Sequence, residues 1–219
     1  MTIELVCFDM AGTTVNDHGL VLEAFRRTID ELGVVGEDAL KAEAHVVETM
    51  GQSKIEVFSV LFDERAHDAN DAFERHFVSA AIEVGVSEVP GARETIETLK
   101  GRGIAVALTT GFSPSTREAL IELLGWSDLV GLRVSPADAG RGRPAPDMVL
   151  LSALKSRVSA VQMIMVVGDT ASDMQAGRRA GVGQCVGVRT GTDDEARLLA
   201  SGADVVLDSV VEVPRLITK

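Results

Sequence analysis

The chain has few of the features that mark secreted, zinc-binding or membrane proteins. Its two cysteines, Cys7 and Cys185, lie far apart in apolar runs, so they indicate neither a disulfide framework nor a zinc site. No apolar run approaches the ~20 residues that a membrane-spanning helix needs. The segment Met1-Thr2-Ile3-Glu4-Leu5 has no basic region of the kind that opens a secretory signal. We therefore expect a cytoplasmic protein that does not bind membranes.

Positive charge is also scarce, because 21 Lys and Arg oppose 33 Asp and Glu and leave a net charge of −12. Nucleic-acid-binding proteins normally carry a basic face, so this balance argues against nucleic acid as a partner. Tyrosine is absent and only five residues are lysine. Hydrophobic residues make up 46% of the 219 positions, which is enough for a globular core. An anionic substrate would need local positive charge or a metal ion to offset the acidic field.

Six short apolar runs predict strands. Most are apolar throughout rather than alternating, as is typical of strands buried on both faces of a parallel sheet. Helical patterns separate them: Ser115-Thr116-Arg117-Glu118 resembles a capping box with Gly125 at the helix end, and the helix at Met174–Ala180 ends at Gly181. We expect a doubly wound, Rossmann-like α/β core with a parallel sheet. The runs are Ile3–Phe8, Ile104–Leu108, Leu129–Val134, Met163–Val167, Cys185–Val188 and Asp204–Leu207.

One long segment interrupts this alternation. From His18 to Val86 the sequence has helical periodicity and no convincing strand. The insertion is too long for a βα loop of ~2–6 residues, so we expect an all-helical cap over the edge of the sheet where ligands bind. The predicted domains are a core of residues 1–15 and 89–219 and a cap of residues 16–88. Three apolar faces are expected to be buried in the cap: Val21, Phe25, Ile29 and Leu32; Leu40, Ala44 and Val47; and Phe73, Phe77, Ala81 and Val84.

Two predicted strands end in a carboxylate. Asp9 follows the first strand and precedes the loop Ala11-Gly12-Thr13, whose backbone N–H groups could approach an anion. Asp169 follows another strand, and Asp173 lies four residues later. Because Mg²⁺ prefers carboxylate, water and phosphate oxygens, Asp9 and Asp169 could bind it while Asp173 orients a bound water or holds the loop. The structural alternatives are that Asp9 caps a turn and that Asp173 is a first-turn acid of a helix.

Two further segments could hold a phosphoryl group. Thr109 and Thr110 end a strand just before Gly111, so the Thr109 hydroxyl and the Thr110 N–H could bind a phosphoryl oxygen. Arg143, within Gly142-Arg143-Pro144-Ala145-Pro146-Asp147, places a positive charge just before a helix. Each segment alone is more often a turn than a site. The order of all four segments along the chain makes a site the better interpretation.

This set of segments resembles the haloacid dehalogenase superfamily, whose phosphotransferases use a nucleophilic Asp, a hydroxyl, a basic residue and an acidic metal loop. The resemblance covers nearly the whole chain, including the helical cap. Members of the family are often dimers through the cap, so a homodimer is a further expectation. It implies a small phosphorylated or phosphonate substrate. The implied roles are nucleophile for Asp9, catalysis for Thr109 and Arg143, Mg²⁺ binding for Asp9, Ala11, Asp169 and Asp173, and substrate binding for Gly12, Thr13, Thr110 and Gly111.

Within that superfamily, Asp9-Met10-Ala11-Gly12-Thr13-Thr14 is similar to the phosphonatase branch. Most superfamily phosphatases have a second Asp at position 11 and a Lys at position 143. Met50-Gly51-Gln52-Ser53-Lys54 resembles the phosphonatase segment whose lysine forms an imine with an aldehyde, so Met50 and Gly51 are expected at the substrate. The chain departs from the branch in four places: Met10 replaces a Trp, Val57 a His and Phe112 a Tyr. In addition, a cysteine near the start of the family's cap has no match around His18-Gly19-Leu20.

Ala11 and Lys54 together favour cleavage of a phosphorus–carbon bond. Ala11 cannot protonate an alkoxide leaving group, a contribution of about 10²–10⁴-fold, whereas a protonated imine on Lys54 would accept the electron pair of the departing carbon. The resemblance thus implies Mg²⁺-dependent hydrolysis of phosphonoacetaldehyde or a related phosphonate through an aspartyl phosphate. One alternative is a small-metabolite phosphate-ester phosphatase in which Lys54 binds substrate as a cation. The other is a receiver-like or nucleotide-binding module in which Asp9 is regulatory.

Overall fold

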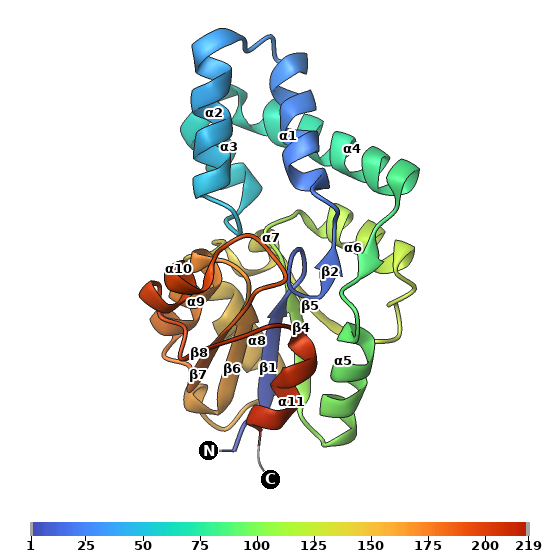
Figure 1. Ribbon diagram of the computed structural model, residues 1–219, viewed down its shortest axis with the longest axis vertical. Coiled ribbons are helices and arrows are strands. Elements are labelled where there is room, and N and C mark those ends of the chain that lie inside the picture. The colour runs from blue at the N-terminus through green and yellow to red at the C-terminus, as the bar shows by residue number, and fades with distance from the viewer. Residues whose placement is uncertain (1, 218–219) are drawn as a thin grey trace.

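A six-stranded sheet forms the centre of the core (Figure 1). The computed structural model describes residues 2–217; residues 1, 218 and 219 of the predicted core domain lie outside the described range. The strand order is β5-β4-β1-β6-β7-β8 and every neighbouring pair is parallel, so the predicted fold class is confirmed. All six predicted runs form strands. They are β1 (Leu5–Asp9), β4 (Ala105–Thr109), β5 (Leu132–Val134), β6 (Ile164–Gly168), β7 (Gln184–Val188) and β8 (Val205–Leu207).

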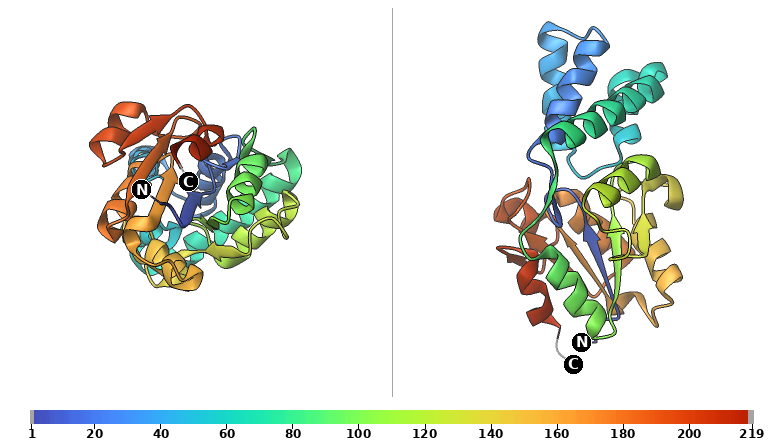
Figure 2. Two further views of the ribbon diagram at one scale, coloured as in Figure 1. Left: turned by 90° about the horizontal axis from the view of Figure 1, so that it is seen from below. Right: turned by 90° about the vertical axis from the view of Figure 1, so that its right-hand side faces the viewer.

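Helices cover both faces of this sheet (Figure 2). Val6 and Phe8 of β1 belong to one hydrophobic cluster, and Leu5 and Cys7 belong to another. Both faces of β1 are therefore buried, which explains why its sequence is apolar throughout. The first cluster includes residues of α5 (Ala92–Gly101), α6 (Pro114–Leu123), η3 (Val210–Glu212) and α11 (Val213–Leu216). The second cluster includes residues of α8 (Asp147–Ser156), α9 (Ala171–Ala180) and α10 (Glu195–Ala200). Two short helices, α7 (Pro136–Ala139) and η2 (Val161–Met163), connect these elements.

A group of four helices stands beyond the carboxyl edge of the sheet (Figure 1). Two short strands, β2 (Val15–Asn16) and β3 (Ser87–Glu88), pair antiparallel and connect it to the core. The predicted domain boundaries, after residues 15 and 88, fall in this ribbon and remain a prediction. Within residues 2–217, no helix has the length and apolar character needed to cross a bilayer. The cap elements are α1 (Leu20–Glu31), α2 (Gly36–Glu48), α3 (Lys54–Phe62), η1 (Asp63–Arg65) and α4 (Ala66–Val84).

Phenylalanine side chains join the cap to the core. The ring centroid of Phe58 lies 6.0 Å from that of Phe25 and 5.6 Å from that of Phe73. Phe77 lies 4.5 Å from Phe112, which belongs to the loop after β4. Aromatic pairs at these separations are favourable beyond the area that they bury. The cap is therefore packed against the loop that follows a central core strand.

The helix α2 is present, but the face of it that was predicted to be buried is exposed. Leu40, Ala44 and Val47 lie on its exposed face, with Leu40 70% exposed, whereas Ala42 and Val46 are buried. Both sets have the spacing of one helix face, so periodicity alone cannot separate them. Packing of α2 against α1 selects the face with the smaller side chains.

Two helix ends also differ from the prediction. The helix α6 begins at Pro114 rather than after Ser115, because the Ser113 side chain accepts the Thr116 N–H and Pro114 fits the first helical position. On α4, Val84 was predicted to lie on the buried face, but it is 65% exposed because it is the last residue of the helix.

Candidate active site

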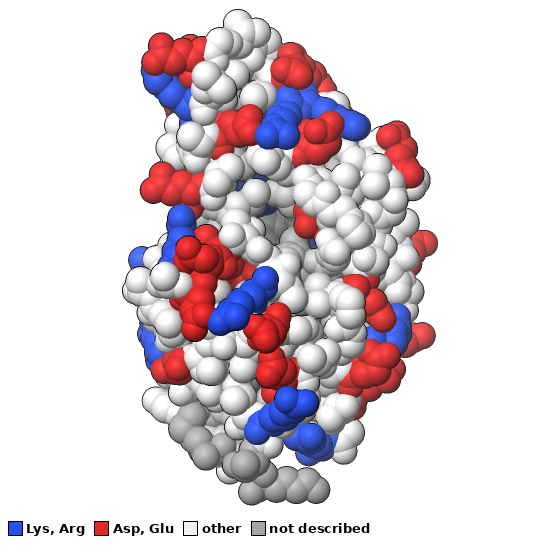
Figure 3. Space-filling view, in the orientation of Figure 1, with Lys and Arg blue, Asp and Glu red and all other residues white. Residues whose placement is uncertain are grey.

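A cavity of about 350 Å³ lies between the carboxyl edge of the sheet and the cap. Figure 3 shows the corresponding hollow at the boundary of the two parts, with charged side chains inside it. The core contributes Asp9, Asp169 and Arg143, and the cap contributes Met50 and Lys54. Predicted residues Ala11, Gly12, Gly51, Thr110 and Gly111 also line it, with Asn16, Asp17, Gly19, Val21, Leu22, Gln52, Phe112, Thr170, Thr190, Gly191 and Thr192.

Three buried carboxylates meet in the core beneath this cavity, and two of them, Asp9 and Asp169, line it. Asp9, Asp169 and Asp173 each offer an oxygen, and these oxygens lie within 4.8 Å of one another. Asp9 ends β1 and Asp169 follows β6, which pairs with β1 in parallel, so their side chains reach the same edge. Each residue is at most 5% exposed. Asp9 and Asp169 are close enough to share an ion.

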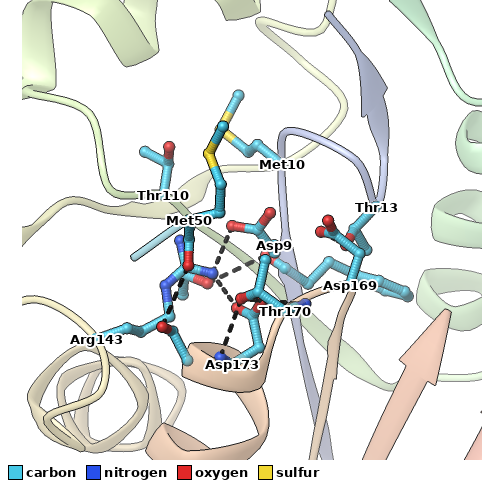
Figure 4. A network of polar contacts seen from close by, with 12 residues as sticks. Asp9, Met10, Thr13, Met50, Thr110, Arg143, Asp169, Thr170 and Asp173 are labelled. Atoms are coloured by element: carbon cyan, nitrogen blue, oxygen red, sulfur yellow. Dashed lines mark hydrogen bonds and ion pairs between the residues drawn. The ribbon is translucent and has the colours of Figure 1, made fainter. Parts of the chain in front are cut away.

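Arg143 connects two of these carboxylates (Figure 4). Its Nη1 donates to Asp9 Oδ1 at 2.6 Å and also to Asp173 Oδ1. Arg143 is 3% exposed, and its Nε has no hydrogen-bond partner among the described residues. A buried, unpaired N–H is costly. The Arg143 Nε–H is therefore left unsatisfied in this conformation, while the residue itself lines the cavity.

The carboxylate cluster carries more negative charge than Arg143 can balance. Burial raises the pKa of Asp9 to about 7, with Arg143 opposing this shift and Asp173 adding to it. Burial, followed by the charges of Asp9 and Asp173, raises the pKa of Asp169 well above its ordinary range. A bound cation would offset this repulsion. The all-oxygen donor set fits a hard divalent ion such as Mg²⁺.

The orientation of Asp169 is fixed by two loops. The Thr13 hydroxyl donates to Asp169 Oδ1 at 2.8 Å, and the Thr192 N–H donates to Oδ2 at 2.9 Å. Gly12 and Gly191 let these loops approach, because a Cβ at either position would overlap the Asp169 carboxylate. Thr13 does not line the cavity. Its observed contact supports Asp169, and the predicted contact with substrate remains a prediction.

Asp173 has a structural role in addition to its place in the cluster. Its Oδ2 accepts the Thr170 N–H at 3.1 Å, and the two residues form the capping box at the start of α9. Its Oδ1 accepts from Arg143. Both oxygens thus have protein donors, as the helix-start alternative for Asp173 requires. Its contribution to metal binding remains a prediction.

Backbone N–H groups in two loops do not point into the cavity as predicted. The Gly12 N–H donates to the Val15 carbonyl at 2.8 Å, and the Thr13 N–H donates to the Met10 carbonyl at 3.2 Å. The Thr110 N–H donates to a carbonyl of β5 at 3.1 Å. These three amides are satisfied by turn and sheet hydrogen bonds. The Ala11 N–H donates no hydrogen bond among the described residues, and its predicted contact with an anion remains a prediction.

The threonines after β4 take different positions. The Thr109 side chain is buried and its hydroxyl donates to the Phe8 carbonyl at 3.3 Å, between β4 and β1. Thr110 and Gly111 line the cavity. The predicted catalytic role of Thr109 needs a rotation of its hydroxyl and remains a prediction.

Lys54 enters the cavity from the cap. It is the first residue of α3, and its N–H donates to the Gly111 carbonyl at 3.2 Å. Its Nζ lies 6.0 Å from the ring centroid of Phe73 and 5.9 Å from that of Phe112. The amine therefore sits beside aromatic rings, while its backbone is attached to the core.

These surroundings make the Lys54 amine less basic. Burial, with a smaller effect of the Arg143 charge, lowers the pKa of Lys54 to about 8; the carboxylates of Asp9, Asp17 and Glu74 partly oppose the shift. Near neutral pH a larger fraction of Lys54 is the free amine than for a lysine in water. The free amine is the form that attacks a carbonyl carbon.

The loop that carries Lys54 fits closely against the core. A Cβ at Gly51 would overlap the Thr170 side chain, and a Cβ at Gly111 would overlap the Gln52 carbonyl. Gly51 has a φ of +80°, a conformation that favours glycine. Both glycines therefore allow the cap loop to close over the carboxylates.

Several residues that line the cavity were not expected from the sequence. Thr190, Gly191 and Thr192 lie just beyond the end of β7, after Arg189, so the rule that polar residues collect at strand ends could have found them. Asp17 and Gln52 lie in a linker and a cap loop, where no strand end marks them. Their places depend on how the cap is seated.

Three buried carboxylates and a guanidinium at the carboxyl edge of a doubly wound sheet are typical of sites for phosphoryl transfer. The model of the haloacid dehalogenase-like hydrolases matches residues 3–181. The chain therefore belongs to this family and is a hydrolase.

Individual relatives agree with this assignment. Phosphonoacetaldehyde hydrolase from Bacillus cereus (strain ATCC 14579) is 34% identical over 213 residues, covering 89% of this chain and 78% of its own length. A phosphonoacetaldehyde hydrolase like protein from Oleispira antarctica matches with a TM-score of 0.85 and 25% identity over 99% of this chain and 92% of its own. A hydrolase from Pseudomonas syringae matches with a TM-score of 0.85 at 21% identity, covering 98% and 97% of the two chains, and supports the fold.

Proposed function

We propose that this hydrolase cleaves the phosphorus–carbon bond of phosphonoacetaldehyde or a closely related phosphonate, using an imine on Lys54 and an aspartyl phosphate on Asp9. The observation that carries the proposal is that Lys54, an amine of lowered pKa, and Asp9 line the same cavity from opposite domains. Relatives named phosphonoacetaldehyde hydrolase support the same substrate. Ala11 supports it further, because a phosphatase for unactivated esters would need an acid there.

The first half of the reaction uses the cap. The Lys54 amine condenses with the aldehyde and releases water, which leaves a protonated imine. An Asp9 oxygen then attacks phosphorus as the phosphorus–carbon bond breaks. The electron pair of that bond moves into the imine and produces an enamine, so the carbon leaves without a free carbanion.

The second half regenerates both side chains. The enamine is protonated on carbon and hydrolysed to acetaldehyde and Lys54, which consumes one water. A second water hydrolyses the aspartyl phosphate to phosphate and Asp9. Because the imine step released one water, the net reaction consumes one water for each phosphonate.

The core side of the cavity stabilises charge on the phosphoryl group. Arg143, which lines the cavity, would place its positive charge against a phosphoryl oxygen. Mg²⁺ would be held by the carboxylates of Asp9 and Asp169 and the Ala11 carbonyl, where it would neutralise charge on the phosphoryl oxygens. Thr13 and Thr192 hold Asp169 in the orientation that this binding needs.

The test compares products. Purified protein with Mg²⁺ and phosphonoacetaldehyde should release acetaldehyde and phosphate in equal amounts, and a Lys54→Arg variant should release neither. Release of phosphate from unactivated sugar phosphates at a higher kcat/KM, independent of Lys54, would contradict the proposal.

That contrary result would establish the second candidate, a small-metabolite phosphatase. One observation favours it. The two positions where phosphonatases carry a His and a Tyr hold Val57 and Phe112, and both are buried among hydrophobic residues of the cap. Neither side chain can move a proton, so imine chemistry needs another group in the cavity.

A further inference from the structure

We propose that Asp17 carries protons between Lys54 and the carbonyl oxygen of the substrate. The inference rests on the proposed function, because it gives the imine step the proton-transfer group that Val57 and Phe112 cannot supply. Asp17 lines the same cavity as Asp9 and Lys54. It lies in the linker between β2 and α1, where the chain enters the cap.

The Asp17 carboxylate is held in place at the start of α1. Its Oδ2 accepts the Val21 N–H at 3.1 Å, and its own carbonyl accepts the Leu20 N–H at 2.9 Å. Among the described residues its Oδ1 accepts no hydrogen bond, and the residue is half-buried. One oxygen thus anchors the side chain while the other is open to a bound molecule.

Few other side chains in the cavity can exchange protons. Its carboxylates, within the part of the chain that the structure describes, are Asp9, Asp17 and Asp169. Asp9 is paired with Arg143, and Asp169 accepts hydrogen bonds on both oxygens. No histidine or cysteine is among the residues described as lining the cavity, and the chain contains no tyrosine. Asp17 is the carboxylate that remains free to serve Lys54.

The charges around Lys54 agree with this choice. Arg143 repels the ammonium form, whereas Asp9, Asp17 and Glu74 attract it. The Glu74 carboxylate already accepts the N–H and hydroxyl of Ser113 at the start of α6, and Glu74 does not line the cavity. Of the two remaining carboxylates, Asp9 is the proposed nucleophile. Asp17 is thus the acceptor for protons that leave Lys54.

The proton balance of the imine step defines what Asp17 must do. When the Lys54 ammonium condenses with an aldehyde, a nitrogen–carbon bond forms, the carbonyl oxygen leaves as water and a protonated imine remains. Two protons therefore move from Nζ to the departing oxygen. Asp17 accepts each proton from nitrogen and donates it to oxygen, so it begins and ends the step as a carboxylate.

The test follows the imine directly. Phosphonoacetaldehyde and borohydride are added to the full-length protein, and the rate at which Lys54 is labelled is measured by peptide mass spectrometry. Asp17→Asn should slow labelling by about 10²–10⁴-fold, since Asn still accepts the Val21 N–H but cannot carry a proton. Asp30→Asn, an exposed carboxylate on α1, is the matched control and should label at the wild-type rate.

Two further readouts separate a chemical role from a structural one. Hydrolysis of p-nitrophenyl phosphate, whose leaving group needs neither an imine nor an acid, should change less than about twofold in Asp17→Asn. Added formate should restore part of the labelling rate of Asp17→Ala. Equal losses of labelling and of p-nitrophenyl phosphate hydrolysis would overturn the inference.

The outcomes also distinguish this inference from the proposed function. Wild-type protein that labels at Lys54, with Asp17→Asn labelling equally fast, would overturn the role of Asp17 and leave the imine mechanism standing. Wild-type protein that turns over substrate without any label on Lys54 would overturn both.

Discussion

The two sides of the cavity hold charge in opposite ways. On the core side, Arg143 pairs directly with Asp9 and Asp173, and Asp169 lies in the same carboxylate cluster. On the cap side, Lys54 lies beside aromatic rings, and its surroundings disfavour its charged form. The core side is suited to binding a charged phosphoryl group, and the cap side to keeping an amine reactive. Under the proposed function, the two domains would supply separate halves of one reaction.

The largest expected effect separates the two sides by disabling the core. Asp9→Asn removes the nucleophile, so release of phosphate from phosphonoacetaldehyde should fall by on the order of 10⁶-fold in kcat. Borohydride labelling of Lys54 should persist, because imine formation does not need Asp9. Phosphate assay and peptide mass spectrometry measure the two activities. The control variant Asp128→Asn changes an exposed carboxylate and should leave phosphate release and labelling unchanged. Loss of labelling in Asp9→Asn would show that the core and cap sides of the cavity do not act separately.

The reverse change disables the cap. Lys54→Arg keeps the positive charge but cannot form an imine, so turnover of phosphonoacetaldehyde should fall more than about 10³-fold. Hydrolysis of p-nitrophenyl phosphate should remain within a fewfold of wild type, because the core side is intact. Steady-state assays of both substrates on Lys54→Arg and on the exposed control Lys41→Arg check this. A parallel loss with both substrates would mean that Lys54 serves phosphoryl binding.

A titration would sharpen the contrast between Lys54 and an ordinary lysine. The pKa of Lys54 is lowered from 10.5 to about 8, so its neutral fraction grows as the pH rises through 8. At pH 7 this fraction should exceed that of an ordinary lysine by about 300-fold. Labelling with an uncharged, amine-reactive reagent, followed by mass spectrometry, should reach half of its maximum near pH 8 and level off above about pH 9 at Lys54, while it still rises at Lys41. The same pH dependence at both residues would contradict the effect of burial.

The smallest expected effect concerns Thr13, which supports the carboxylate cluster through its hydrogen bond to Asp169. Thr13→Val removes the hydroxyl that orients Asp169, so Mg²⁺ should bind about 10–100-fold more weakly. Calorimetric titration of Mg²⁺ into the free protein measures this affinity, and the exposed Thr98→Val is the control. Unchanged affinity would show that Asp169 needs no support from Thr13.

The core was easier to predict from sequence than the cap because its strands are buried on both faces. Continuous apolar runs identify such strands, and a polar residue at the end of a run marks the edge where ligands bind. Asp9, Asp169 and Arg143 were found in this way or through the family resemblance. Helix periodicity was less decisive: two sets of residues on α2 have the same spacing, and only packing against α1 shows which is buried.

Features that depend on how distant segments meet could not be predicted. The hydrogen bond from Thr192 to Asp169 and the place of Asp17 in the cavity arise from the meeting of separate loops. The lowered pKa of Lys54 depends on burial beside Phe73 and Phe112. The homodimer through the cap and the cytoplasmic location remain predictions.

The most direct test of the account is the chemical identity of the adduct on Lys54. Wild-type protein with Mg²⁺ is mixed with phosphonoacetaldehyde, reduced with borohydride during turnover and analysed by peptide mass spectrometry. An ethyl group on Lys54, in larger amount than acetaldehyde alone produces at the released concentration, is the predicted result, because reduction of the imine left after the phosphorus–carbon bond breaks puts two carbons on that lysine. Release of phosphate and acetaldehyde with Lys54 unmodified would contradict the account.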